Sequence, residues 1–566
     1  MAPKIIYNPS VDYALANIDL LSLLFESSEC PTQEETLLHV EAANTANFLT
    51  KSQTRHYVKS IAHILRSRFN IGRLGAGKDV VICISSGQIL LPSLFYATIA
   101  AGGVYSSASN TGTDQELARQ INHGKTTLLV ASPDCEELAR MAARASDLSP
   151  DRILILDSYD GKRSLLDHAQ YDLLDPSGKD ERNLLDWEVV TDANTLRVRP
   201  ICLIYSSGTT GQPKVGVCIS HTNLVSSGLI LGYAHRDYLN RRRALDSTFD
   251  FQYRTLAHLP TAHIAGIAGY FVHPSMFGGT IYWMPKFNFG DFLKYNAEHR
   301  ITFFFTVPPV YLQIAQSSQV TDQFNSLHHA QCGAAPIGPE LVARAERILG
   351  CAISQTWGLS ETTGSVTAQA WDCPDRTGSI STIAANLRMR IVDEMEQDVE
   401  DGCEGEFVVQ GPTVTVDYWE DMKATARAFT KCGSWLKTGD IGLRRNGKLY
   451  ILDRKKELIK YKGIQVAPAE LEAVLVSHPL IYDAAVIGVS DPVMVGNEVP
   501  RAYVVADQSK ITDDGIMKFV KARLASYKQL RGGVIFIDKI PKSANGKILR
   551  RVLRDLAGRE SAIAKL

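Results

Sequence analysis

The fold of this chain is decided by one stretch of sequence, Pro200-Ile201-Cys202-Leu203-Ile204-Tyr205-Ser206-Ser207-Gly208-Thr209-Thr210-Gly211-Gln212-Pro213-Lys214. The apolar residues up to Ile204 predict a buried strand, and the polar residues after it predict a loop at the carboxyl end of that strand. Gly208 and Gly211 allow this loop to turn tightly and to bring its backbone close to a ligand. A phosphate-binding loop is one interpretation, and a solvated surface turn is the other.

The side chains of this loop suit phosphate oxygens. Beside the exposed backbone N–H groups of the turn, donors come from Ser206, Ser207, Thr209, Thr210 and Lys214. The loop is not the mononucleotide P-loop, because it lacks the G-x-x-x-x-G-K-[ST] spacing. Its ligand therefore has to be inferred from the rest of the chain.

Length and composition predict a globular protein of at least two domains. The 566 residues exceed what one hydrophobic core usually supports. The chain is 45% hydrophobic and 21% charged, which is ordinary for a globular protein. With 60 Lys and Arg against 61 Asp and Glu, it lacks the basic excess of many nucleic-acid-binding proteins, and we expect no nucleic-acid partner.

The pattern of apolar residues predicts an α/β fold. Strand-like runs such as Val80–Ile84 and Thr127–Val130 alternate with helical segments such as Glu136–Arg144. This alternation predicts a large N-terminal region of stacked, mostly parallel sheets covered by helices, with ligands at the carboxyl ends of the strands.

A small, mobile α+β domain is expected at the C-terminal end. Near Leu452 the charge balance changes and a new pattern of strands and helices begins, with a helix expected over Ala469–Val476. We therefore expect one domain over 1–452, a hinge at 453–456 and a second domain over 457–566. The second domain is richer in Lys and Arg than in Asp and Glu, which suits contact with polyphosphate or a solvated basic face.

Five more polar segments follow the loop. In chain order they are Gly333-Ala334-Ala335-Pro336, Trp357-Gly358-Leu359-Ser360-Glu361, Lys437-Thr438-Gly439-Asp440, the run from Asp453 to Val466, and Pro541-Lys542-Ser543-Ala544-Asn545-Gly546-Lys547. With the first loop, this ordered set resembles the acyl-adenylate-forming superfamily. That superfamily includes acyl- and aryl-CoA synthetases, 4-coumarate–CoA ligases, beetle luciferases and the adenylation domains of peptide synthetases. The resemblance extends from Gln115-Glu116-Leu117 to Lys547, nearly the whole chain.

The resemblance implies an ATP-dependent ligase that activates a carboxylic acid as acyl-AMP and transfers the acyl group to CoA. Mg²⁺ is the implied cofactor, and AMP binds to the domain over 1–452. Trp357 stands where many relatives have tyrosine and keeps a flat apolar face for the purine. The other residues implied to contact the nucleotide are Ser206, Ser207, Gly208, Thr209, Thr210, Gly211, Lys214, Gly333, Ala334, Ala335, Pro336, Gly358 and Ser360.

Three further residues are implied to bind the metal, the ribose and the phosphates. Glu361, together with Thr209, is the expected Mg²⁺ ligand, because Mg²⁺ prefers carboxylate and phosphate oxygens. An acid in the first turn of a helix is the alternative for Glu361. Asp440 is expected to hold both ribose hydroxyls and Arg454 to contact ribose or phosphate. Without the resemblance, Asp440 would be a turn residue before a strand.

The resemblance also implies two arrangements of the small domain. In the first, Lys547 reaches the carboxylate and the α-phosphate as a compact positive charge. Lys456 matches the hinge position, where backbone angles change between the arrangements. In the second arrangement, Lys547 is replaced for thioester formation by Lys460, Lys462, Gly463 and Gln465.

The sequence narrows the acid to a class. His263 stands where peptide-synthetase domains for α-amino acids have an aspartate, which argues for an acid without a free α-amine. His263 closes the acyl tunnel or gates entry of the thiol, and a core histidine is the alternative. Room for an aryl or medium aliphatic chain is expected between small residues, namely Ala262, Cys332, Gly333, Thr362, Thr363 and Gly364.

Three other functions share parts of this pattern. An acyl-AMP ligase that loads a carrier-protein thiol has every adenylation motif and differs at the acceptor tunnel. A luciferase-like monooxygenase also keeps the motifs but needs a luciferin-shaped pocket. An inactive nucleotide-binding relative is disfavoured, because the charged residues Lys214, Glu361, Asp440, Arg454 and Lys547 are all intact.

The chain ends in Ala564-Lys565-Leu566, which is similar to the S-K-L peroxisomal address. We expect an import receptor to read this end and carry the protein into the peroxisomal matrix, with the cytosol as the alternative. A role in fatty acid β-oxidation-like or secondary metabolism would follow. The longest apolar stretch, Ile89–Tyr105, is too short and too broken for a membrane span. The ten cysteines lack a C-x-x-C pair and predict free thiols.

Overall fold

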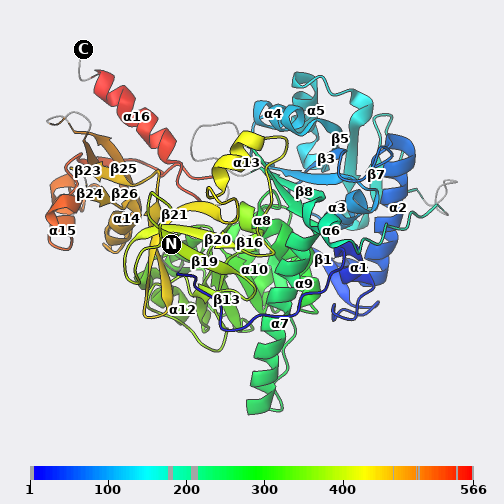
Figure 1. The fold of residues 1–566 in the computed structure, drawn as a ribbon, viewed down its shortest axis with the longest axis horizontal. Helices are drawn as coiled ribbons and strands as arrows, with labels where there is room; N and C mark the ends of the chain where they lie inside the picture. Colours follow the sequence, from blue (N-terminus) through cyan, green and yellow to red (C-terminus); the bar gives the residue numbers. More distant parts are fainter. Residues whose placement is uncertain are drawn as a thin grey trace.

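The computed structural model describes residues 5–175, 183–205, 215–462, 464–491, 494, 497–543 and 546–563 (Figure 1). The strand predicted before the first loop is confirmed as β8 (Pro200–Tyr205). The loop residues from Ser206 to Lys214 lie outside the described residues, as do Gly463 and the terminal Ala564-Lys565-Leu566.

The first sheet of the N-terminal region has seven strands in the order β7-β6-β5-β3-β4-β8-β9. Its five inner strands are parallel, and the two edge strands β7 and β9 are antiparallel to their neighbours. The predicted parallel sheet is therefore confirmed. The remaining strands are β3 (Val80–Ile84), β4 (Val104–Ala108), β5 (Thr126–Ala131), β6 (Ile153–Asp157), β7 (Ser164–Leu166) and β9 (Gly216–Ser220).

Helices cover both faces of this sheet. Val81 of β3 packs with α2 (Lys51–Phe69) and α3 (Leu91–Ala100) on one face. On the other face, Ile82 packs with α4 (Asp114–Gly124) and α5 (Glu136–Ala145). Burial of both faces explains why β3 is an uninterrupted apolar run. The helix predicted over Glu136–Arg144 is confirmed as α5.

Two further sheets complete the core of the N-terminal region, with the orders β10-β11-β1-β2 and β12-β13-β14. All of their pairs are parallel except β1–β2. The strands are β1 (Leu37–Glu41), β2 (Asn44–Thr50), β10 (Arg254–Ala257), β11 (Thr280–Trp283), β12 (Phe303–Thr306), β13 (His329–Cys332) and β14 (Ile353–Gln355). The accompanying helices are α1 (Leu20–Phe25), α7 (His221–Leu245), α10 (Phe289–Glu298), α11 (Pro308–Gln316) and α12 (Pro339–Leu349). One end of α7 projects from the body of the molecule in Figure 1.

The fourth sheet departs from the parallel pattern. Its strands β19 (Arg388–Val392), β20 (Gly405–Gln410), β21 (Leu436–Arg445) and β22 (Lys448–Arg454) are antiparallel throughout. Asp440 lies inside β21, paired with Arg454, so the interpretation of Asp440 as a turn residue was wrong. The polar residues around Asp440 give no strand pattern in the sequence. The strand forms because it pairs with β20 and β22, and local sequence does not reveal these partners.

The C-terminal part has a hydrophobic core of its own. Strands β25 (Ile481–Ser490), β26 (Glu498–Ala506) and β27 (Val534–Phe536) form a sheet covered by α14 (Pro468–Val476) and α15 (Asp513–Lys521). A hairpin of β23 (Ile459–Tyr461) and β24 (Ile464–Val466) precedes them, and α16 (Arg550–Ile563) ends the chain. The predicted helix near Ala469 is confirmed as α14, and the mixed composition agrees with the expected α+β architecture.

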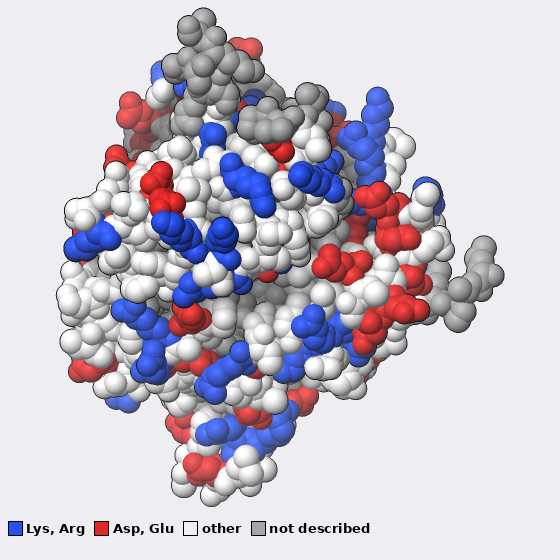
Figure 2. Space-filling view, turned by 90° about the vertical axis from the view of Figure 1, so that its left-hand side faces the viewer, with Lys and Arg blue, Asp and Glu red and all other residues white. Residues whose placement is uncertain are grey.

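Figure 2 shows the face on which this C-terminal part lies. Lys and Arg side chains are spread over that face with Asp and Glu between them, so it is not a continuous basic surface. Among the described helices, none is both long enough and apolar enough to cross a membrane.

Candidate active site

Glu361 is linked through Tyr418 to β9, the strand that follows the first loop. The hydroxyl of Tyr418 donates to Glu361 Oε1 at 2.8 Å, and Thr415 N donates to the Glu361 carbonyl at 2.8 Å. Tyr418 is bridged to Val217 of β9, the strand that follows the loop. Burial, followed by the charge of Glu361, raises the pKa of Tyr418, so this hydroxyl stays a donor. The contacts place one carboxylate close to β9, the strand that follows the segment predicted to bind phosphate.

Trp357, Asp440 and Arg454 form a connected set. The indole Nε1 of Trp357 donates to Asp440 Oδ2 at 2.8 Å, and Arg454 Nε lies 3.0 Å from Asp440 Oδ1. Asp440 is only 3% exposed, so the two donors compensate the cost of burying its charge. The structure therefore brings together three residues that the sequence assigned to purine, ribose and phosphate.

The segment predicted to line the adenine follows β13. Gly333 packs under Phe305, whose ring would lie 2.8 Å from a Cβ added at Gly333. Ala334 has a left-handed backbone, with φ of 68°. These constraints turn the chain sharply at the carboxyl end of a parallel strand, where ligands of α/β folds bind.

Gly358 is required by a close approach of backbone to backbone. A Cβ at Gly358 would lie 1.7 Å from the carbonyl oxygen of Gly364, which pairs with the strand of Gly358. The two short strands β15 (Gly358–Leu359) and β16 (Gly364–Ser365) thus hold the turn η5 (Ser360–Thr362), and with it Glu361. Glu361 is in the first turn of a 3₁₀ helix, as the alternative interpretation expected.

Lys547 reaches this site from the C-terminal part. Burial, together with the charges of Arg454 and Lys456, lowers the pKa of Lys547 to about 7, and the charge of Asp440 acts on it in the opposite direction. Its loop is closed by the Ser543 N–H donating to the Lys547 carbonyl at 2.8 Å. A Cβ at Gly546, where φ is 73°, would lie 2.8 Å from Pro309 at the start of α11, so the loop rests directly on the N-terminal region.

We expect activity to depend on the charge of Lys547. Because kcat/KM reports the ionisation of the free enzyme, kcat/KM for ATP should fall as pH rises through about 7, where Lys547 loses its proton. Lys547→Arg keeps its charge at all working pH values and should lose this descending limb, even if its maximum is lower. The measurement is adenylation rate between pH 5.5 and 9. A limb that persists in Lys547→Arg would assign the ionisation to another group.

His263 lies close enough to Lys547 for the charge of that lysine to act on its ring. Its Nδ1 accepts the Ala265 N–H at 3.2 Å at the start of α8 (Ile264–Gly266). Burial and then the charge of Lys547 lower the pKa of His263 to about 4, so the ring is neutral at physiological pH. A π-helical turn over Ile267–Val272 follows, and Gly269 within it faces open space.

The residues assigned to the second step lie elsewhere. Lys460 and Gln465 pair across the β23–β24 hairpin, and both are exposed to solvent. Lys462 has a left-handed backbone with φ of 48°, and its N–H is held by Asn497 Oδ1 at 2.5 Å. In this arrangement the charge of Lys547 interacts with Asp440, while Lys460 and Gln465 are exposed to solvent.

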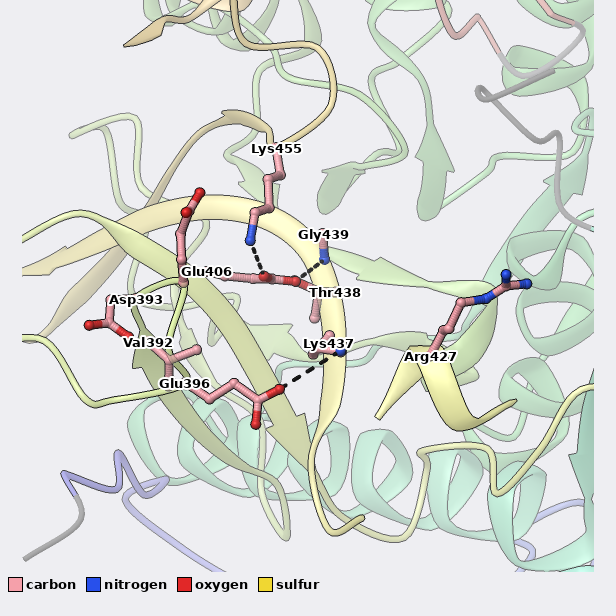
Figure 3. A pocket seen from close by; sticks show the side chains of 10 residues that line it. Val392, Asp393, Glu396, Glu406, Arg427, Lys437, Thr438, Gly439 and Lys455 are labelled. Carbon is pink, nitrogen blue, oxygen red and sulfur yellow. Dashed lines mark hydrogen bonds and ion pairs between the residues drawn. The ribbon is translucent and has the colours of Figure 1, made fainter. Parts of the chain in front are cut away.

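A cavity of about 400 Å³ lies beside the first residues of β21, the strand that carries Asp440 (Figure 3). It is lined by charged side chains, among them Glu406, Lys437 and Lys455. Glu406 accepts from Gly439 N at 3.1 Å and from Lys455 Nζ at 3.1 Å. Lys437 also pairs with Glu396 at 3.9 Å, and these contacts anchor the start of the strand that carries Asp440 (Figure 3).

Comparison with known proteins identifies the family. A model of the AMP-binding enzyme family matches residues 31–419, and a model of the AMP-binding enzyme C-terminal domain matches residues 470–547. The chain belongs to the AMP-binding enzyme family. Its relatives in that family include acyl-CoA synthetases and 4-coumarate–CoA ligase-like proteins.

Three members of the AMP-binding enzyme family illustrate the similarity. A candidate acyl-coenzyme A synthetase of Emericella nidulans is 50% identical over 98% of this chain and 100% of its own length. The peroxisomal OPC-8:0-CoA ligase 1 of Arabidopsis thaliana is 31% identical over 92% of this chain and 91% of its own. The crystal structure of ATP-bound MatB from Rhodopseudomonas palustris has a TM-score of 0.80 and 24% identity, over 95% of this chain and 98% of that one.

The side chains of the candidate site are compatible with Mg²⁺ that binds together with a nucleotide. In the part of the chain that the structure describes, there is no group of three or more His, Cys, Asp or Glu residues that could hold a metal. Mg²⁺ is commonly bound by one or two carboxylates together with phosphate oxygens and water. The single carboxylate of Glu361 suits that mode.

One residue of this site was missed from the sequence. Tyr418 orients Glu361, yet 57 residues separate them and no motif includes Tyr418. The only local signal is an aromatic pair, Tyr418-Trp419, and such pairs are common in cores.

Proposed function

We propose that this chain activates a small carboxylic acid with ATP as acyl-AMP and then passes the acyl group to CoA, at one site built around Asp440. The chain is an AMP-forming acid–thiol ligase of the AMP-binding enzyme family. The observation that carries the assignment of the site is the convergence of Lys547 with Trp357, Asp440 and Arg454.

In the first step, a carboxylate oxygen of the acid attacks the α-phosphorus of ATP and pyrophosphate leaves. Two anions have to meet, so positive charge aimed at the α-phosphate is the main requirement. Lys547 and Arg454 supply that charge, and Asp440 holds the ribose hydroxyls. Glu361 would hold Mg²⁺, which when bound neutralises charge on the phosphates.

In the second step, the thiol of CoA attacks the acyl carbonyl and AMP leaves. Lys460, Lys462, Gly463 and Gln465 would serve this step after the domain over 457–566 turns at the hinge over 453–456. The exposure of Lys460 and Gln465 on the β23–β24 hairpin, in an arrangement where Lys547 interacts with Asp440, supports two arrangements. Lys456 is the residue around which we expect the backbone to turn.

The acid is proposed to be an aryl or medium-chain aliphatic acid without an α-amine. Neutral His263 offers no countercharge for an ammonium group. Further along the chain, no atom from outside the local helix lies within 4 Å of a Cβ position at Gly269, which leaves space for an acyl group. Thr362 and Thr363 are buried and are proposed to form a wall of the acid pocket.

Exchange of labelled pyrophosphate into ATP tests the first step. We expect exchange that depends on Mg²⁺ and on an acid from a mixed pool of aryl and C4–C18 acids. Chelation of the metal should abolish the exchange. No exchange with any acid of the pool would contradict the proposed activity.

An acyl-AMP ligase that loads a carrier-protein thiol is the second candidate, since it shares the adenylation step. Relatives named as CoA ligases favour CoA as the acceptor. A luciferase-like monooxygenase is a third possibility. It has no such support among these relatives.

We further propose that the protein is imported into the peroxisomal matrix. The C-terminal Ala564-Lys565-Leu566 supports this, and one relative is a peroxisomal ligase. Deletion of these three residues from a protein with an N-terminal fluorescent tag should leave it in the cytosol, with ligase activity of the purified variant unchanged. Microscopy with a peroxisomal marker checks this. Import that continues after the deletion would contradict the proposal.

A further inference from the structure

Asp453 connects two parts of the chain that lie on opposite sides of Lys456. It lies on β22, in register with Ile441 of β21, and so belongs to the sheet that carries Asp440. Its carboxylate Oδ2 accepts the backbone N–H of Ala469 at 2.9 Å, in the first turn of α14. Asp453 is 6% exposed. This hydrogen bond therefore joins the sheet before Lys456 to a helix after it.

The charge of the same carboxylate acts on the guanidinium of Arg550, whose side chain is 13% exposed. Arg550 Nη2 donates to both oxygens of Glu472 at 2.7 Å, and Arg550 Nε donates to the Val486 carbonyl at 3.2 Å. Burial lowers the pKa of Arg550, but the carboxylates of Glu472 and Asp453 outweigh it and raise that pKa. Arg550 begins α16 directly after the loop of Lys547. The charge of Asp453 therefore acts on the element that positions Lys547.

The segment between Asp453 and Lys456 is fixed to the sheet of Asp440. Lys455 N donates to the Gly439 carbonyl at 2.8 Å, and Lys455 Nζ pairs with Glu406 at 3.1 Å (Figure 3). On the far side of Lys456, Glu457 is buried and paired with Arg554 of α16 at 2.5 Å. A turn of the backbone at Lys456 would keep the Lys455 contacts and the Glu457 contact but break the bond from Asp453 to Ala469.

We infer that Asp453 is a positioning residue that holds the C-terminal part where Lys547 reaches Asp440, and that its bond to Ala469 opens before thioester formation. The inference rests on the proposed two-step function. A carboxylate at the N-terminal end of a helix is favoured by the backbone N–H groups and the helix dipole. Loss of that contact shifts the population away from the arrangement that forms acyl-AMP.

The two half-reactions measured separately test this role. Asp453→Ala should lower acid-dependent pyrophosphate exchange about tenfold, the effect of losing one hydrogen bond to a charged group. Conversion of supplied acyl-AMP to acyl-CoA should be unchanged or faster. Asp453→Asn keeps an acceptor for Ala469 but loses the charge, so its exchange rate should lie between those of wild type and Asp453→Ala. Equal loss in both half-reactions would overturn the inference.

Asp19→Ala is the matched control. Asp19 is also a buried carboxylate, 1% exposed, and it accepts the Ser22 N–H at 2.9 Å at the start of α1. This contact lies within the N-terminal region. Asp19→Ala should therefore change both half-reactions by the same factor if it changes them at all. If Asp19→Ala slowed one half-reaction tenfold more than the other, an unequal effect on the two half-reactions would not be evidence for a contact across Lys456.

A second measurement is independent of catalysis. Lys455 and Lys456 are exposed and are sites for trypsin. Under native conditions without substrate, the fragment that ends near Lys456 should appear several-fold faster in Asp453→Ala than in wild type or Asp19→Ala. Unchanged cleavage in Asp453→Ala would overturn the inference. If wild type supports no exchange with any acid, the proposed function fails, and the cleavage rates still decide whether Asp453 holds the two parts together.

Discussion

Lys547→Ala should slow formation of acyl-AMP by about 10²–10³-fold, the size expected when one preorganised charge is removed from the reacting centre. Lys547 is the charge that the C-terminal part brings to Arg454 and Asp440. Conversion of supplied acyl-AMP to acyl-CoA should remain close to the wild-type rate, because other residues serve that step. Single-turnover assays of each half-reaction make this measurement.

The control for Lys547→Ala is a neighbouring lysine of the same loop. Lys542 pairs with Asp483 at 2.6 Å within the C-terminal part and does not face Asp440. Lys542→Ala should leave both half-reactions within about threefold of wild type, as expected for a partly exposed ion pair. If Lys547→Ala slows both half-reactions equally, the assignment of Lys547 to the first step alone is wrong.

Asp440→Asn should raise KM for ATP by about 10- to 100-fold, the cost of weakening hydrogen bonds to a charged acceptor. The amide can still accept from Trp357 Nε1, but it loses the ion pair with Arg454 and one acceptor for the ribose. Because the ribose is bound in both steps, use of supplied acyl-AMP should weaken as well. Asp440→Asn thus differs from Lys547→Ala, which affects one step.

A different ion pair of the same sheet serves as a control that distinguishes a loss of ATP binding from a loss of stability. Arg390 Nε lies 2.7 Å from Asp398 Oδ1, with side chains 6% and 12% exposed. Asp398→Asn should lower the melting temperature at least as much as Asp440→Asn does, because it leaves the buried guanidinium of Arg390 without its partner, whereas the side chain of Arg454 is 34% exposed. Only Asp440→Asn should change KM for ATP. An unchanged KM in Asp440→Asn would remove Asp440 from the nucleotide site.

Runs of apolar residues were enough to predict the parallel part of the fold. Val80–Ile84 and Pro200–Ile204 are buried strands because helices or neighbouring strands cover them, and that environment leaves a continuous apolar signature in the sequence. The helix near Ala469 was predicted for a similar reason. The antiparallel sheet around Asp440 was not predicted, since its strands mix polar and apolar residues and depend on partners far along the chain.

The members of the site were predicted from their motifs, but their mutual contacts were not. Trp357 was expected to pack on a purine, and the structure shows in addition that its indole N–H binds Asp440, 83 residues away. Tyr418 reaches Glu361, and Asp453 reaches Ala469, only because separate strands and helices are brought together. Such long-range hydrogen bonds leave no periodic signal in the sequence. Sequence patterns therefore indicate candidate residues of this site better than the contacts between them.

The most direct test of the account is a mass-spectrometric analysis of the products formed from ATP, Mg²⁺, CoA and a mixed pool of aryl and C4–C18 acids. The account predicts AMP together with one or a few acyl-CoA thioesters, absent when CoA is omitted and strongly reduced in Lys547→Ala. The thioesters would also identify the preferred acid. Accumulation of acyl-AMP without any thioester would contradict CoA as the acceptor, and the absence of both products would contradict the proposed reaction.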